Sequence, residues 1–212
     1  MTNFIPIFPL GVVVYPGEQL NLHIFEPRYK QLIRECMDMQ KPFGIPVVID
    51  EQMMEFGTLV EITMIKQVYD DGKMDIITRG IQVFRLLEVV KEIPDKLYSG
   101  AIVNYPDNES ESVHPGMSAI VQAIRELHQL LRVEKNFPRP DNDMRSYDVA
   151  HLAGMSLQEE YELLQLFRED QRVEYLKRHL HKVLPVVKEM ETLKERVKLN
   201  GHFRELRSLG FE

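Results

Sequence analysis

Residues 4–37 read FIPIFPLGVVVYPGEQLNLHIFEPRYKQLIRECM, and this stretch decides how the first half of the chain folds. The β-branched run Val12–Val14 predicts a short buried strand. Pro16 and Gly17 predict a tight turn, because proline fixes φ at one turn position and glycine accepts a positive φ at the next. Apolar and polar residues then alternate over residues 19–24, which predicts a strand with one face on a core and one in water.

A helix is predicted to begin at Pro27. Proline suits the first helical turn because its missing N–H would have no partner there, and Glu26 faces the positive end of the helix dipole. Apolar residues follow at helical spacing at Tyr29, Leu32, Ile33, Cys36 and Met37. These apolar faces require a larger sheet to bury them.

Short apolar or alternating segments continue to Tyr105 and predict that sheet. Further strands are expected at residues 41–49, 57–69, 74–78, 83–91 and 98–105. Asp71-Gly72 predicts a hairpin turn, whereas Arg79-Gly80 is expected to interrupt the strands. Residues 50–56 read as a polar loop. Roughly six or seven short strands favour a small barrel or a folded sheet.

Beyond Pro106 the apolar period changes from that of strands to that of helices. Residues 106–115 are polar and acidic and read as a connector. Apolar residues then recur at helical spacing, and helices are expected near residues 117–131, 147–154, 157–167 and 170–200.

The helix ends carry their own signals. Ser156 and Glu159 form a capping-box sequence, and Asp170 is expected to cap the following helix. Pro185 is expected to kink or restart that last helix, which Asn200-Gly201 is expected to close.

Two motifs of the opening stretch resemble a known family. Residues 9–17 (PLGVVVYPG) and 24–29 (IFEPRY) are similar to the start of the Lon protease amino-terminal domain, the substrate-binding part of an ATP-dependent protease. The resemblance covers nearly the whole chain. It implies an α+β fold, with a small PUA-like β-barrel or folded sheet and one helix in residues 1–110. A C-terminal α-helical bundle is expected in residues 111–212.

The same resemblance implies a non-catalytic module that binds unfolded or partly folded proteins and peptides, with a protease or a chaperone as its partner class. The sequence contains neither a phosphate-cradling G-x-x-x-x-G-K-[ST] loop nor a Rossmann glycine cluster. The ATPase and serine–lysine peptidase modules therefore have no counterpart here. We expect no enzymatic activity and no cofactor.

Composition narrows the functional classes further. The 212 residues carry a net charge of −7 and a single cysteine. One cysteine excludes an intrachain disulfide and fits a reducing compartment. We expect no signal peptide, because residues 1–20 lack a basic segment followed by an apolar core, and we expect no membrane-spanning helix, because no apolar run approaches ~20 residues. A cytoplasmic protein without membrane or nucleic-acid partners is expected.

Individual reactive side chains have structural explanations. Cys36 lies on the apolar stripe of the first helix, where a free cysteine is usually a small core residue. His179 and His181 are two residues apart on a predicted helix and point in different directions, so we expect no metal site.

A mild excess of methionine, 11 residues, suggests a surface that accepts varied apolar partners. Met37 and Met64 are expected to fill gaps in the core, whereas the Met53-Met54 pair in the predicted loop is a candidate exposed patch. The predicted peptide-binding surface consists of Tyr15, Pro16, Phe25, Met53, Met54 and Phe56.

Two alternatives remain open at this point. A PUA-like sheet of this kind could bind nucleic acid, although the acidic net charge and the lack of a basic strand face weigh against it. A hydrolase that uses Cys36 requires a thiol accessible in the native state.

Overall fold

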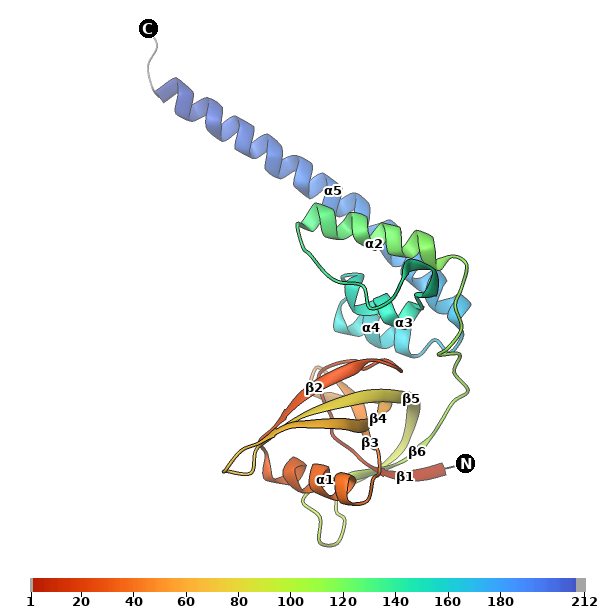
Figure 1. Cartoon of the computed structure of the whole chain (residues 1–212). Coiled ribbons are helices and arrows are strands. Elements are labelled where there is room, and N and C mark those ends of the chain that lie inside the picture. The colour runs from red at the N-terminus through yellow and green to blue at the C-terminus, as the bar shows by residue number, and fades with distance from the viewer. Residues whose placement is uncertain (1, 209–212) are drawn as a thin grey trace.

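The computed structural model describes residues 2–208, and the side chains of residues 2–197. An antiparallel sheet with one helix precedes a set of helices, the last of which projects from the body (Figure 1). The strands are β1 (Thr2–Pro6), β2 (Gln19–Ile24), β3 (Phe43–Ile49), β4 (Gln52–Val68), β5 (Met74–Val90) and β6 (Gly100–Asn104). The helices are α1 (Pro27–Asp38), α2 (Met117–Leu131), η1 (Asp141–Asp143), α3 (Ser146–Val149), η2 (Ala150–Leu152), α4 (Leu157–Leu164) and α5 (Glu169–Ser208). The predicted order, sheet first and helices after, is confirmed.

The six strands form one sheet in the order β1-β6-β5-β4-β3, and β2 pairs with β5 outside this path. The sheet curls on itself, because the chain just after β1 forms parallel bridges to β3 at Ile7–Gly44 and Leu10–Val47. The Phe8 N–H donates to the carbonyl of Gly44 at 2.8 Å. The curl encloses the apolar side chains of the strands.

Three predicted features of the sheet are wrong, and the first two concern Val12–Val14 and residues 50–56. Val12–Val14 is not a strand, although Val13 and Val14 are buried in an extended segment. A run of β-branched residues indicates that a segment is buried, but a buried segment need not form hydrogen bonds with a neighbouring strand. Residues 50–56 are not a loop: Asp50 and Glu51 form the turn with φ values of 49° and 63°, and β4 begins directly after them. Two positive φ values are what a tight twisted hairpin requires.

Gly80 does not interrupt the sheet but lies inside the continuous strand β5. Its N–H donates to the Glu18 carbonyl at 2.8 Å, and its carbonyl accepts from the Gly17 N–H at 2.9 Å. A Cβ at position 80 would lie 2.2 Å from the Tyr15 carbonyl oxygen. Glycine is therefore required where the turn at Tyr15–Glu18 crosses the strand.

The chain has apolar cores in both halves. In the sheet half, α1 packs its predicted stripe onto the strands, and Leu32 and Ile33 are fully buried. In the helical half, α2, α3, α4 and the start of α5 share a second cluster, which also takes in Tyr15 and Val83 from the sheet half. One hydrophobic cluster thus spans the junction.

Buried arginines fix the predicted connector onto the helices. Arg172 is completely buried; it pairs with Glu169 at 2.8 Å and donates to the Glu109 carbonyl and to Asn108 Oδ1. Arg145 donates to the Ser110 carbonyl at 3.0 Å. The connector therefore joins the two halves through fixed contacts.

The last helix is longer than predicted. α5 runs unbroken through Pro185 and past Asn200-Gly201 to Ser208, so neither signal ends it. Asp170 lies in its first turn rather than at its cap. The capping box of α4 is confirmed, because Ser156 and Glu159 each bond the other's backbone N–H.

Within residues 2–208, no helix combines the length and the apolarity needed to cross a bilayer. The division of the chain at residues 110 and 111 stays a prediction.

Candidate functional site

Tyr15 and Pro16, expected at the binding surface, are buried at the junction of the two halves. The Tyr15 hydroxyl donates to the Glu160 carbonyl at 2.9 Å, and its ring stacks on Tyr147 with centroids 5.0 Å apart. Burial, with Glu160 nearby, raises the pKa of Tyr15 above its ordinary value, so the hydroxyl stays a neutral donor. Tyr15 therefore connects the halves and is not exposed to a partner.

Met54 and Phe56 are partly buried against the helical half at the start of β4. The Phe56 ring lies 5.7 Å from that of Phe167, and its N–H donates to the Tyr161 hydroxyl at 3.2 Å. Met53 keeps 38% of its surface exposed at the same end of the strand. These three residues thus lie beside the junction.

Phe25 lies elsewhere and is 56% exposed. It directly follows β2. The last residue of β2, Ile24, pairs with Met74 at the start of β5, and the C-terminal end of β4 pairs with the same residue. Phe25 therefore lies near the C-terminal end of β4. The Phe25 ring stacks on His23 at 6.1 Å, and His23 meets the edge of Tyr69 at 6.0 Å. The six predicted residues therefore do not form one surface, since β4 separates Phe25 from Met53 along its length.

The structure offers a different surface on the second half of β4. β3 pairs with β4 only as far as Val60, whereas β5 pairs with β4 up to Val68. Among residues 2–208, no strand pairs with residues 61–68 on the side away from β5. We call residues 61–68 the β4 edge. An unpaired edge presents backbone donors and acceptors that another extended chain can use.

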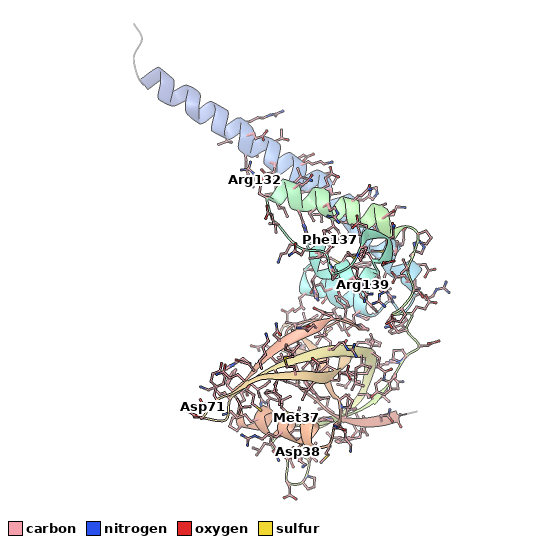
Figure 2. All side chains as sticks on the ribbon, viewed as in Figure 1. Met37, Asp38, Asp71, Arg132, Phe137 and Arg139 are labelled. Atoms are coloured by element: carbon pink, nitrogen blue, oxygen red, sulfur yellow. The ribbon has the colours of Figure 1, made fainter. Side chains whose placement is uncertain are left out.

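A hollow of about 500 Å³ lies between the β4 edge and the C-terminal end of α1. Figure 2 labels Met37 at this end of α1 and Asp71 in the hairpin that follows β4. The hollow has walls from the helix end, the β4 edge and one residue of β5. Its lining comprises Cys36, Met37, Gln40, Lys41, Pro42, Glu61, Ile62, Thr63, Met64, Ile65 and Ile81.

Large apolar side chains are exposed along this hollow. Met64 is 56% exposed, and Ile81 and Ile65 are 39% and 37% exposed. The expectation that Met64 fills the core is wrong, because the β4–β5 register shifts between Ile62 and Met64 and so breaks the strand alternation. Met37 does pack against the core, as predicted.

The polar groups of the hollow do not form a catalytic set. Glu61 pairs with Arg79 at 2.6 Å. Cys36 is 5% exposed, and burial raises the pKa of its thiol to about 12, which keeps it protonated and poorly nucleophilic. This environment argues against a hydrolase that uses Cys36. The site is suited to apolar and backbone contacts.

Histidines serve structural roles in the helical half. His179 is buried, with Nε2 3.1 Å from the Ala153 carbonyl and Nδ1 3.2 Å from Glu159. In the part of the chain that the structure describes, no three His, Cys, Asp or Glu side chains are placed to hold a metal ion.

Comparison with known proteins places the sequence among substrate-binding domains. Residues 5–182 match the family of the ATP-dependent protease La (LON) substrate-binding domain. A Lon protease of Parabacteroides distasonis is 27% identical over 132 residues, which cover 58% of this chain and 16% of that protein. The chain thus spans about a sixth of that relative's length.

Two solved structures share the fold. The Lon N-terminal domain protein from Xanthomonas campestris superposes with a TM-score of 0.63 at 26% identity, covering 82% of this chain and 96% of that one. The N-terminal domain of Mycobacterium avium complex Lon protease superposes with a TM-score of 0.59 at 11% identity, covering 84% and 98%.

Proposed function

The chain belongs to the family of the ATP-dependent protease La (LON) substrate-binding domain, and from this premise we propose that it binds extended apolar segments of unfolded or partly folded proteins. The observation that carries the proposal is the unpaired β4 edge beside a hollow whose mixed lining includes the exposed apolar side chains Met64, Ile65 and Ile81. The module acts by binding alone and supplies no reacting group of its own. A protease or a chaperone is the partner class that would use the captured segment.

Recognition combines two kinds of contact. The backbone of an extended segment pairs with the β4 edge, which supplies affinity without sequence preference. Alternate side chains of the segment then enter the hollow and contact Met64, Ile65 and Ile81. Methionine adapts to apolar groups of different shape, which suits a site that accepts many clients.

Of the binding residues predicted from the sequence, we place Phe25 on the proposed peptide path and leave Met53 and Met54 outside it. Phe25 belongs to the exposed rings with His23 and Tyr69, directly after the β4 edge, so we assign it to the far end of the peptide path. Met53 and Met54 lie at the opposite end of β4, beside the helices, and are not part of the proposed path.

A matched pair of methionines tests the site. The probe is a reduced and carboxymethylated protein that cannot refold, and its affinity is measured by fluorescence anisotropy. We expect Met64→Ser to weaken binding about tenfold, because burying a methionine side chain contributes roughly 1.5 kcal/mol. Met53→Ser, on the same strand, serves as the control and should bind as the parent protein does. Equal binding by Met64→Ser, or loss of binding in Met53→Ser, would contradict the proposal.

The PUA-like label, with its nucleic-acid-binding role, is a weaker candidate. The net charge of −7 opposes phosphate contacts, and the lining of the hollow includes one acidic residue, Glu61, as well as one basic residue, Lys41. Retention on an RNA column that falls with salt would favour this alternative over peptide binding.

A further inference from the structure

A second hollow, of about 480 Å³, lies between α2 and α5. These two helices pack side by side in the helical half of the protein (Figure 1). We call this space the α2–α5 hollow. It shares no lining residue with the hollow beside the β4 edge. Its volume lies within the range of roughly 300–1,000 Å³ that is usual for small-molecule sites.

The walls of the α2–α5 hollow are mainly apolar. Gly116, Ala119 and Ala123 follow one another along one face of α2, and Val173 and Leu180 lie on the facing side of α5. Because the side chains on α2 are small, they leave open the space between the helices. A flat apolar molecule, such as an aromatic ring system, can therefore contact both helices at once.

Contacts between the two helices bound the hollow at both ends. At one end Gly116 lies so close to α5 that a Cβ at this position would be 3.3 Å from Val173 Cγ1. Beyond the other end Glu126 of α2 and Lys188 of α5 form an ion pair of 2.6 Å. Each of these two charged residues lies one turn beyond the last lining residue of its helix. The hollow therefore suits a compact molecule better than a partner helix, which would have to cross both contacts.

The ionised side chains at the rim of the hollow have partners of opposite charge. Asp170 pairs with Arg168 at 3.0 Å. Glu174 pairs with Arg178 at 3.2 Å, and the Lys177 ammonium lies 3.9 Å from the same carboxylate. The charges at the rim are therefore largely balanced, which favours a neutral occupant over an ion.

One backbone acceptor faces the α2–α5 hollow. In a regular α-helix the carbonyl of residue 181 accepts the N–H of residue 185, but residue 185 is a proline and has no N–H. His181 and Pro185 both line the hollow, one turn apart, and the carbonyl lies between them. A carbonyl without a donor at the wall of an apolar space is unfavourable. A ligand with an N–H or O–H group can supply the donor that the helix lacks.

We propose that the α2–α5 hollow binds a small neutral aromatic molecule that carries one N–H or O–H donor, such as an indole, an arylamine or a phenol. The rings lie against the small residues of α2 and contact Val173 and Leu180 of α5. The donor bonds the His181 carbonyl. This site is independent of the proposed peptide site, which lies on the sheet half of the chain.

The first experiment titrates the whole chain with N-phenyl-1-naphthylamine, a neutral arylamine whose fluorescence rises in apolar surroundings. We expect saturable binding. Ala119→Leu fills the hollow from an exposed position of α2 and should weaken binding about tenfold. Ser118→Leu adds the same side chain outside the lining and should bind as the parent protein does. Absence of saturable binding, or unchanged binding by Ala119→Leu, would overturn the proposal.

A variant of the peptide site separates the two hollows. Met64→Ser removes an apolar side chain beside the β4 edge and should leave the affinity for the arylamine unchanged. Loss of arylamine binding in Met64→Ser would place the probe beside the β4 edge and would overturn the assignment to the α2–α5 hollow.

A pair of compounds tests the hydrogen bond. Phenyl 1-naphthyl ether has the same rings with an oxygen in place of the N–H, and its affinity is measured by displacement of the arylamine. The parent protein should bind the arylamine about fivefold more tightly than the ether. Pro185→Ala supplies the missing N–H to the His181 carbonyl, so this variant should bind the two compounds equally. Equal affinities for the parent protein, or a preference for the arylamine that persists in Pro185→Ala, would overturn the proposed donor contact.

Discussion

At the residue scale, the junction between the sheet and the helices depends on a few polar side chains inside an apolar contact. The Tyr15 hydroxyl donates to the Glu160 carbonyl. His151 places Nε2 3.1 Å from Glu18 and Nδ1 2.7 Å from Glu160, so one imidazole bridges carboxylates from both halves. Its ring also lies 4.9 Å from the Tyr15 ring. The protonation state of His151 is therefore coupled to the docking of the two halves.

This coupling predicts a pH dependence of stability. Partial burial opposes protonation of His151, but the hydrogen bonds to Glu160 and Glu18 outweigh it and raise the pKa to about 10. Because the folded pKa lies above the unfolded value of about 6.5, this stabilisation is fully present below pH ~6.5 and is lost as the pH rises toward 10. Urea unfolding at successive pH values measures it.

The comparison variant is His151→Gln, which keeps hydrogen-bonding groups but cannot titrate. We expect the stability difference between the parent protein and this variant to shrink steadily from pH 6.5 to pH 10. A difference that stays constant over this range would mean that the imidazole is not charged in the folded state.

At the element scale, glycine positions decide where strands can cross other segments. Gly80→Ala would press a Cβ against the Tyr15 carbonyl, a backbone atom that cannot move aside. We expect a loss of about 2–3 kcal/mol in the free energy of unfolding, measured by urea denaturation. Gly11→Ala is the matched control, because its Cβ would meet only the Val48 carbonyl at 3.7 Å, and it should change stability by less than about 0.5 kcal/mol.

The elements that local chemistry specifies are the ones that the sequence predicts well. Pro27 marks the start of α1, the Asp71-Gly72 turn joins β4 to β5, and Ser156 caps α4, because each signal acts within a few residues. Features that depend on distant segments are not predictable in this way. From the sequence, Gly80 predicts a break in the strand, because the turn at Tyr15–Glu18 that requires this glycine lies far away in the chain. Pro185 predicts the end of a helix, but α5 continues through it.

In the candidate site, too, local features could be predicted from the sequence and features that depend on distant segments could not. Phe25, one of the predicted binding residues, is exposed, whereas Tyr15 is buried because the helices cover it, which no local sequence signal reveals. Met64 reads as core from strand alternation, and only the register shifts in β4 turn it toward the hollow. The unpaired β4 edge has no sequence signature, since it results from where β3 ends.

At the scale of the whole molecule, buried ion pairs fix the connector that joins the two halves. Arg172→Leu leaves the buried Glu169 carboxylate without its cation and frees the Glu109 segment. We expect a loss of roughly 3–5 kcal/mol in stability, with faster proteolytic cleavage within residues 106–115. Arg168→Leu is the control; it breaks only the exposed pair with Asp170 and should cost at most about 1 kcal/mol.

Peptide pairing with the β4 edge can be measured by amide hydrogen exchange with and without a saturating unfolded client, because exchange reports on the backbone that is proposed to pair. We expect new protection at residues 61–68, with the β3–β4 turn and the Tyr15–Glu18 turn unchanged. Protection confined to residues 50–56 or to the helices, with residues 61–68 exchanging as in the free protein, would contradict it.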